Sequence, residues 1–328
     1  MSEKFKAIII DNQNDKFSRD IKEIDTTHLK DGNVLVKVDY SSLNFKDAMI
    51  LNDGGRIVRK FPFVPGIDFS GTVVESEDSK FVKDDKVILT GFRVGEAFFG
   101  GFAQYAKVDS NFLVKIPKDL DSHKAMMLGT AGFTALLCSF AVKAKEELLL
   151  GEKVKDVLVT GASGGVGSTA IQIGKILGAT VIACASTEAK LSVCKNLGAD
   201  HLINYDSENL KLKVRELTNG KGADVVYDPV GDKYCEPAVR ALAFRGRLIV
   251  IGFAAGEIPR IPINLLLLKE ASILGSALAE SQRVYPEQTQ AERQEVLDMF
   301  RDGKYKPLVT NVLPFKSAIE GFDMFQNR

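Results

Sequence analysis

Residues 157–177 read VLVTGASGGVGSTAIQIGKIL, and this stretch decides the fold. Its first residues are aliphatic or β-branched, as is typical of a strand buried in a parallel sheet. Apolar residues then recur at helical spacing on one face, at Val166, Ala170, Ile173 and Leu177. The stretch therefore predicts a strand that turns directly into a helix.

Four glycines, at positions 161, 164, 165 and 167, stand at or just after the predicted turn. They leave the backbone bare, so successive N–H groups can approach a diphosphate at the positive end of the helix. The motif alone is a weak signal, because tight turns use the same residues. Within a strand–turn–helix pattern it predicts a dinucleotide site, whose contacts in the turn are Ser163, Gly164, Gly165 and Val166.

The sequence that follows repeats the alternation of strand and helix. Further strand patterns lie at residues 180–185, 202–205, 225–228 and 248–251. Two of the stretches between them carry apolar faces of helical spacing: Leu191, Cys194 and Leu197 on the first, then Leu210, Val214 and Leu217. This alternation predicts a doubly wound parallel sheet of the α/β class, and it favours a dinucleotide site over a sheet with an empty crevice.

Length and composition predict a cytoplasmic enzyme of two domains. The 328 residues are comfortable for two domains of the usual ~100–200 residues. Lysine plus arginine equals aspartate plus glutamate at 43 each, without a run of like charge, which argues against nucleic acid as a partner. No apolar run approaches the ~18 residues that span a bilayer, and Met1 to Phe5 lacks the pattern of a signal peptide.

The four cysteines and three histidines do not form a metal-binding pattern. The cysteines, at positions 138, 184, 194 and 235, include no close pair of metal-binding spacing, and the histidines stand alone in the sequence. We therefore predict buried or surface thiols in a reducing compartment and no metal site.

The first third of the chain has short strand patterns separated by polar, glycine and proline turns. A compact segment rich in proline and glycine, residues 61–74, ends in a strand pattern, and others lie at residues 6–10, 34–40, 86–89, 100–106 and 112–117. This arrangement predicts a β-rich, barrel-like first domain.

The order of these parts resembles the medium-chain dehydrogenase/reductase superfamily over nearly the whole chain. Residues 1–142 look most like its zinc-free acrylyl-CoA reductase branch, which is quinone-oxidoreductase-like, through SSLNFKDAM (41–49), KFPFVPGIDFSGTV (60–73) and GTAGFTALLC (129–138). Residues 157–328 look more like NADPH:quinone oxidoreductase, through VTGASGGVGS (159–168), LGADHLINY (197–205), VVYDPVG (225–231) and RLIVIGFAAGEIPRIPINLLLLK (247–269). The resemblance changes within 143–156, as in a natural or a constructed recombinant.

The resemblance implies a GroES-like catalytic domain at 1–125, a Rossmann domain that binds NADPH at 126–264, and a return to the catalytic domain at 265–328. In relatives the last segment ends in a glycine-led strand, which is missing after Gln326-Asn327-Arg328. Residues 263–280 include a strongly apolar run and an expected strand, Ser272 to Gly275. In the superfamily this region pairs Rossmann sheets across a homodimer, and a buried strand of a monomer is the alternative.

The resemblance also bears on the chemistry. Zinc-dependent relatives need a thiolate and an imidazole, because zinc is held by sulfur and nitrogen donors. Those positions look here like Asn44 and the segment Gly66-Ile67-Asp68. Hydride transfer without a Lewis acid needs an acceptor that is already polarised, such as an unsaturated thioester of the acrylyl-CoA type, an enone or a quinone. The alternative is a crystallin-like or otherwise non-catalytic protein that binds NADPH.

Four candidate catalytic residues follow from the resemblance. Asn44, Lys46 and Asp47 match the motif beside the nicotinamide, and Arg93 matches a position near the cleft. An amide can orient a carbonyl and a cation can stabilise enolate charge, whereas solvent is the favoured proton donor. The alternative is a structural ion pair between Lys46 and Asp47, with Arg93 as a solvated loop residue.

The end of the second Rossmann strand, Cys184-Ala185-Ser186-Thr187, predicts the coenzyme. An acid at this strand tip would bind the ribose hydroxyl of NADH and repel the 2′-phosphate of NADPH. Ser186, Thr187 and Lys190 suit the phosphate instead, and Glu188 is expected to point outward. The resemblance adds further NADPH contacts: Phe45, where the acrylyl-CoA branch usually has tyrosine, with Thr130, Ala185, Tyr205, Gly252 and Phe253.

Overall fold

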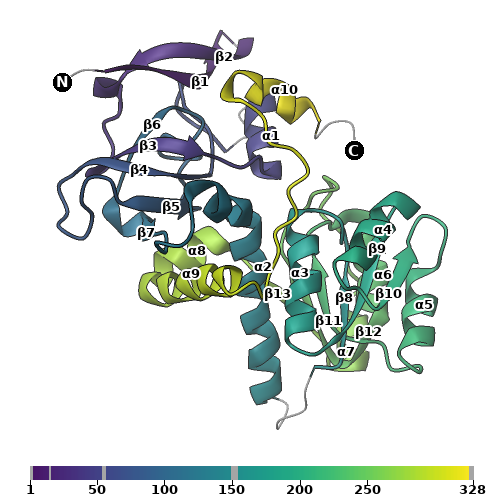
Figure 1. The fold of residues 1–328 in the computed structure, drawn as a ribbon. Coiled ribbons are helices and arrows are strands. Elements are labelled where there is room, and N and C mark those ends of the chain that lie inside the picture. Colours follow the sequence, from purple (N-terminus) through teal and green to yellow (C-terminus); the bar gives the residue numbers. More distant parts are fainter. Residues whose placement is uncertain (1–2, 15, 54–56, 149–153, 325–328) are drawn as a thin grey trace. The chain divides into compact units, whose positions relative to one another are not determined.

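The structure is a computed structural model that describes residues 3–14, 16–53, 57–148 and 154–324, with the backbone alone for 137–148. The chain forms two compact units, whose elements Figure 1 labels. The β-rich unit comprises Met1–Phe133, Ala279–Arg301 and Val309–Arg328, and the Rossmann unit comprises Thr134–Leu278 and Asp302–Leu308. The side chain of Cys138, part of the stretch 143–156 and the chain after Met324 lie outside the described residues.

The Rossmann unit contains a six-stranded parallel sheet in the order β10-β9-β8-β11-β12-β13. The strands are β8 (Asp156–Val159), β9 (Thr180–Ala185), β10 (His201–Asn204), β11 (Ala223–Asp228), β12 (Leu242–Val250) and β13 (Ser272–Gly275). They fall close to the predicted strands, although β12 begins earlier, at Leu242. The order reverses beside β8, which is the arrangement of a doubly wound sheet and confirms the predicted fold class.

Alternate residues of these strands enter two separate cores. Val157 and Val159 lie in one core and Leu158 in the other, since successive strand side chains point to opposite faces. Helices α3 (Gly165–Ile176) and α4 (Glu188–Asn196) contribute to the first core, and α5 (Leu210–Leu217) and α6 (Cys235–Ala241) to the second. The sheet is therefore buried on both faces, which is why its strands read as aliphatic runs. The unit also contains η3 (Asp232–Tyr234) and α7 (Asn264–Lys269).

The β-rich unit contains an antiparallel sheet in the order β6-β3-β4-β5-β7 and a separate hairpin, β1-β2. The strands are β1 (Lys4–Gln13), β2 (Lys16–Asp25), β3 (Val34–Tyr40), β4 (Asp68–Ser76), β5 (Lys86–Thr90), β6 (Tyr105–Val108) and β7 (Val114–Lys115). Strand β2 corrects the sequence analysis, which expected only polar turns between 10 and 34. Its side chains are exposed or half-buried throughout, so no buried apolar run marks it as a strand.

Besides the first part of α2 (Ser122–Leu148), the described part of this unit contains four α-helices and three short 3₁₀ helices: α1 (Phe45–Asp53), α8 (Leu278–Val284), α9 (Pro286–Arg301), α10 (Ala318–Asp323), η1 (Thr26–His28), η2 (Ser110–Phe112) and η4 (Phe315–Ser317). Phe322 of α10 packs against Phe102, with 5.2 Å between ring centroids, and shares a core with Ile8 and Ile50. In Figure 1 α10 accordingly lies beside α1.

Helix α2 (Ser122–Leu148) is interrupted at Gly129, whose backbone is left-handed with φ 51°. A second helical segment therefore begins at Thr130. Across the described residues no helix is both long enough and apolar enough to cross a membrane.

Candidate active site

The turn between β8 and α3 owes its shape to its glycines. Gly161 has φ 53°, a conformation that favours glycine, and a Cβ on Gly167 would overlap the carbonyl oxygen of Gly161. Gly164 is the N-cap of α3 and provides no side-chain cap, and Gly164 and Gly165 are both exposed. The first turn of α3 therefore presents N–H groups that a diphosphate can bind, beside the half-buried Ser163 and Val166.

A buried carboxylate braces this turn. The Thr160 hydroxyl donates to Asp228 Oδ1 at 2.6 Å, and the same oxygen accepts from the backbone N–H groups of Val230 and Gly231 at 3.1 and 3.0 Å. Asp228, at the end of β11, thus ties the glycine turn to the loop after the neighbouring strand. The sequence analysis missed this role, although a polar residue at the end of a buried strand is a signal that could have indicated it.

Three of the predicted cofactor residues lie together at the tip of β9. Lys190 Nζ donates to Ser186 Oγ at 3.1 Å, and Tyr205 forms a hydrogen bond with the same serine. Burial, with the neighbouring ring of Tyr234 at 4.2 Å, raises the pKa of Tyr205 to about 12, so its phenol remains a neutral donor. One cation and two hydroxyls therefore converge where a phosphate could bind.

Thr187 and Glu188 follow Ser186 and bond to different partners. Thr187 caps α4, because its hydroxyl accepts from the Lys190 backbone N–H at 3.3 Å. Glu188 is exposed in the first turn of α4 and accepts from Asn204 Nδ2 at 3.1 Å. Glu188 is thus held by the last residue of β10, while the Thr187 hydroxyl caps α4.

The other predicted cofactor residues of the Rossmann unit follow the carboxyl ends of strands. Ala185 ends β9 and is buried, whereas Gly252 and Phe253 follow β12. Ala254 and Ala255 donate their N–H groups to Pro229 and Val230 at 3.2 and 3.0 Å, which joins the loops after β11 and β12. The glycine turn, the β9 tip and these loops share the carboxyl edge of the sheet, where doubly wound folds bind nucleotides. The residues fit a phosphorylated dinucleotide.

In the β-rich unit Asn44 is the centre of a hydrogen-bond network. Its Nδ2 atom lies 3.0 Å from Asp47 Oδ2, 3.0 Å from Asp68 Oδ2 and 3.1 Å from Ser42 Oγ. Asp68 also accepts from Ser42 N, Ser42 Oγ, Thr130 N and Thr130 Oγ1, at 3.0, 2.7, 2.9 and 2.8 Å. Asp68 is thus a second centre of the network, although the sequence analysis named it only within the zinc segment.

Asp47 is fully buried and does not form the alternative ion pair with Lys46. Its Oδ2 accepts from the Asn44 backbone and side chain, and its Oδ1 accepts from Ile67 N at 3.0 Å. Burial, and then the charge of Asp68, raises the pKa of Asp47 to about 8, against the opposing hydrogen bonds. Asp47 therefore holds the loops around Asn44 together rather than presenting an oxygen at the surface.

Lys46 instead pairs with Glu96, at 2.8 Å. The lysine side chain is 42% exposed and the glutamate only 11%, so the ammonium group sits at the edge of solvent. This corrects the sequence alternative, in which Asp47 was the partner, and it adds Glu96 to the site. Arg93 is exposed in the same loop as Glu96, with φ 61°.

The two remaining predicted residues lie next to this network. Phe45 begins α1 and is half-buried. Thr130 directs both its backbone N–H and its hydroxyl to Asp68, so the carboxylate caps the second segment of α2. The structure therefore brings Asn44, Asp47 and Thr130 into one cluster, with Lys46 and Glu96 as a separate pair.

The donor set around Asn44 consists of amide, hydroxyl and carboxylate groups, without thiolate or imidazole. Among the described side chains, no group of three or more histidine, cysteine, aspartate or glutamate residues is arranged to hold a metal ion. The Asn44 amide instead lies between the two carboxylates and donates toward both.

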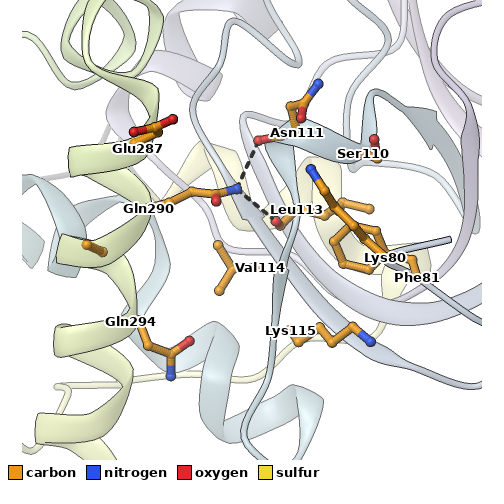
Figure 2. Close-up of a pocket in the computed structure, with 11 residues that line it drawn as sticks. Lys80, Phe81, Ser110, Asn111, Leu113, Val114, Lys115, Glu287, Gln290 and Gln294 are labelled. Atoms are coloured by element: carbon orange, nitrogen blue, oxygen red, sulfur yellow. Dashed lines mark hydrogen bonds between the residues drawn. The ribbon is translucent and has the colours of Figure 1, made fainter. Parts of the chain in front are cut away.

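A cavity of about 470 Å³ lies elsewhere in the β-rich unit, between α9 and the segment Ser110–Lys115. Figure 2 shows Gln290 reaching from α9 to the carbonyl oxygens of Asn111 and Leu113, at 3.3 and 3.5 Å. None of the predicted site residues lines this cavity. Its polar groups serve to attach α9, and the predicted chemistry lies around Asn44 instead.

Two family models match the chain. "Alcohol dehydrogenase GroES-like domain" matches residues 30–118, and "Zinc-binding dehydrogenase" matches residues 165–297. The chain is 40% identical to the probable acrylyl-CoA reductase AcuI of Escherichia coli over 76% of its own length and 75% of that protein. It is 36% identical to the putative quinone oxidoreductase YhfP of Bacillus subtilis, over 84% and 82%.

Solved structures agree with these matches. The structure of E. coli YhdH with bound NADPH superposes with a TM-score of 0.84 at 32% identity, over 98% of this chain and 96% of that one. The structure of B. subtilis YhfP with bound NAD superposes with a TM-score of 0.83 at 31% identity, over 99% and 97%. Structures similar to this chain thus contain either form of the coenzyme.

Proposed function

The chain belongs to the zinc-free, quinone-oxidoreductase-like branch of the medium-chain dehydrogenase/reductase superfamily, and from this premise we propose that it is an NADPH-dependent reductase. The observation that carries the proposal is the cluster of Ser186, Lys190 and Tyr205 at the tip of β9. It offers a cation and two hydroxyls to a 2′-phosphate, and the nearby Glu188 is bonded to Asn204. Related structures with bound NADP or NADPH support this choice.

The acceptor is an activated alkene of the acrylyl-CoA or enone type, or a quinone. Bound NADPH supplies the hydride. Lys46 and Arg93 provide positive charge for the oxygen on which negative charge develops. Asn44, whose amide N–H groups are directed to Asp47 and Asp68, holds the start of α1, the helix that carries Lys46. Asp47 is fully buried with both oxygens bonded, so the proton comes from solvent.

An acrylyl-CoA-type alkene is preferred over a quinone. Resemblance of the β-rich unit to the acrylyl-CoA branch supports this preference, as does the 40% identity to the relative with that name. Phe45 stands where that branch usually has tyrosine, and a phenol at this position would add a hydrogen bond near the nicotinamide. Phe45→Tyr is therefore the first variant to compare with the natural chain.

The enzyme is a cytoplasmic homodimer. The three described cysteines are buried free thiols, which suits a reducing compartment. Strand β13 is the last strand of its sheet, and Ile263, Leu267 and Leu268 nearby are 79%, 80% and 73% exposed. Pairing of residues 263–280 with a second copy would cover both the strand edge and these side chains.

Loss of NADPH absorbance on adding acrylyl-CoA, a small enone or a quinone tests the function. We expect every alkene to be reduced faster than the quinone. Equal or reversed rates would refute the choice of acceptor while leaving a reductase. Tight NADPH binding with no turnover by either the natural chain or Phe45→Tyr would show a non-catalytic nucleotide-binding protein instead.

A further inference from the structure

The loop Thr90–Glu96 of the β-rich unit has an unusual backbone. Gly91, Phe92, Arg93 and Gly95 all have positive φ, at 82°, 51°, 61° and 76°. Side chains with a Cβ rarely adopt this region, and a bulky residue such as phenylalanine does so least of all. Such a conformation persists only where surrounding contacts determine it.

Two buried polar side chains of α8 and α9 supply those contacts. Gln282 of α8 accepts from Phe92 N at 2.8 Å and donates to Thr90 O at 2.9 Å. Arg293 of α9 donates to Thr90 O and, at 2.8 Å, to Thr90 Oγ1. Its guanidinium carbon lies 4.5 Å from the centre of the Phe92 ring. The two side chains therefore hold both the backbone and the ring of the left-handed segment.

The same face of α9 also fixes the other side of the Phe92 ring. Gln290 donates to Asn111 O and Leu113 O (Figure 2). Arg293 donates to Phe112 O at 3.4 Å. Phe112 in turn stacks on Phe92, with 4.6 Å between centroids and 13° between planes. The Phe92 ring thus contacts both the Arg293 guanidinium and the Phe112 ring.

Burying the charged side chain of Arg293 costs free energy that packing alone would not require. It is 3% exposed, its Nε has no hydrogen-bond partner, and no ion pair joins it to a carboxylate of the described residues. Burial lowers the pKa of Arg293 to about 9, which reflects the cost of a desolvated charge. An apolar side chain of similar length would fill this space at lower cost. The loop needs several hydrogen-bond donors at this point, which a guanidinium group provides and an apolar side chain does not.

The loop carries one cation of the proposed site, Arg93, and holds the other, Lys46 of α1, through Glu96. Arg93 projects from it into solvent, and Glu96 pairs with Lys46 at 2.8 Å. The Arg93 carbonyl accepts from Glu96 N and Ala97 N at 3.1 and 2.8 Å. The position of Arg93 is therefore coupled to that of Glu96, which pairs with Lys46.

We propose that Arg293 and Gln282 are positioning residues, which keep Thr90–Glu96 in its left-handed form so that Arg93 and Lys46 face the acceptor. This inference rests on the proposed function. It predicts that the two residues set the affinity for the acceptor and leave that for NADPH unchanged, although neither touches the substrate.

The test compares Arg293→Met and Arg293→Lys with Arg301→Met, which removes an exposed arginine of the same helix that pairs with Asp298 and Asp119. We expect Arg293→Met to raise the acceptor KM about ten- to a hundredfold, as displaced binding groups do, with Arg293→Lys between it and wild type. The NADPH Kd should stay within about twofold in all three variants, and Arg301→Met should match wild type. Equal weakening of NADPH and acceptor would indicate general loosening and overturn the proposal.

Gln282→Met keeps the test decisive if Arg293→Met does not fold, because it removes neutral hydrogen bonds only. The acceptor KM should rise here too, by a smaller factor, and a wild-type KM in folded Gln282→Met and Arg293→Lys would refute the proposal. Amide exchange gives a readout that does not need turnover. The amides of Glu96 and Ala97 do not contact Gln282, so faster exchange there reports the whole loop.

These readouts separate the two proposals. A wild-type protein that reduces no acceptor would refute the proposed function, while exchange at Glu96 and Ala97 would still test the positioning. Unchanged exchange at these amides in Gln282→Met would refute the positioning even in an active enzyme. Exchange in β3 and β4 should stay at the wild-type rate in either case.

Discussion

The glycine turn of the Rossmann unit and the Asn44 network of the β-rich unit are built in opposite ways. The turn uses backbone N–H groups of one continuous stretch, and glycines give it its shape. The network uses side chains from Asn44, Asp68 and Thr130, which are far apart in sequence. A site made from backbone can be recognised in the sequence, whereas a site made from distant side chains is assembled only by the fold. Substitutions in the two sites should therefore have different effects.

An added methyl group should break the backbone-built site. In Gly167→Ala the new Cβ would overlap the carbonyl oxygen of Gly161. We expect a loss of roughly 1–3 kcal/mol or more in the free energy of unfolding, and weaker NADPH binding as the turn shifts. Denaturant unfolding and NADPH titration measure the two effects. Lys195→Ala, at an exposed position of α4, is the control. Equal stability of the two variants would contradict this description of the turn.

The coenzyme specificity of the same unit should depend on one cation. Hydrogen bonds to charged groups contribute roughly 1.5–3 kcal/mol, so Lys190→Ala should weaken NADPH by about one to two decades. NADH, which lacks the 2′-phosphate, should bind almost as before. Titrations with both coenzymes measure this, with Lys195→Ala at the exposed end of the same helix as control. Wild-type protein that binds NADH as tightly as NADPH, or a variant that loses both equally, would be inconsistent with this pocket.

The Asn44 network should instead make the stability of the folded protein depend on pH. The pKa of Asp47 is about 8 in the fold and 3.8 as a reference, so the folded protein holds a proton that the unfolded chain releases between these values. Its contribution to stability is therefore present at low pH and is lost as pH rises toward 8, by at most about 1.4 kcal/mol per unit.

Asp47→Asn is neutral at every pH and should remove this dependence. The stability of wild type relative to the variant should fall steadily from about pH 4 to about pH 8. Urea unfolding across this range measures the difference, with the exposed Asp20→Asn as control. A difference that does not change with pH would mean that Asp47 is ionised in the folded protein.

Burial on two faces explains why the Rossmann strands could be predicted. Strand β9 and strand β13 have the predicted bounds, because aliphatic runs between helices mark such strands. Strand β2 and helices α8 and α9 were not predicted. The exposed hairpin strand has no apolar run, and α9 buries polar residues such as Arg293 and Thr289 against the β-rich unit.

The partners of the candidate catalytic residues were still harder to predict from the sequence. The motif placed Lys46 and Asp47 side by side, and adjacency suggested an ion pair. The fold gives Lys46 a partner 50 positions away and turns Asp47 inward to bond Ile67. Neither Glu96 nor Asp228 carried a local signal strong enough to assign its partner. Charge complementarity across such distances depends on topology, which the spacing of residues does not contain.

A reductase of this kind should turn over without a metal ion. The Asn44 amide stands between Asp47 and Asp68 where zinc-dependent relatives use a thiolate, and the surrounding donors are oxygen atoms and an amide. The measurement is NADPH consumption with acrylyl-CoA before and after exhaustive chelation, alongside the metal content of the purified protein. We expect equal rates and no stoichiometric zinc. Activity that disappears on chelation and returns with added zinc would contradict it.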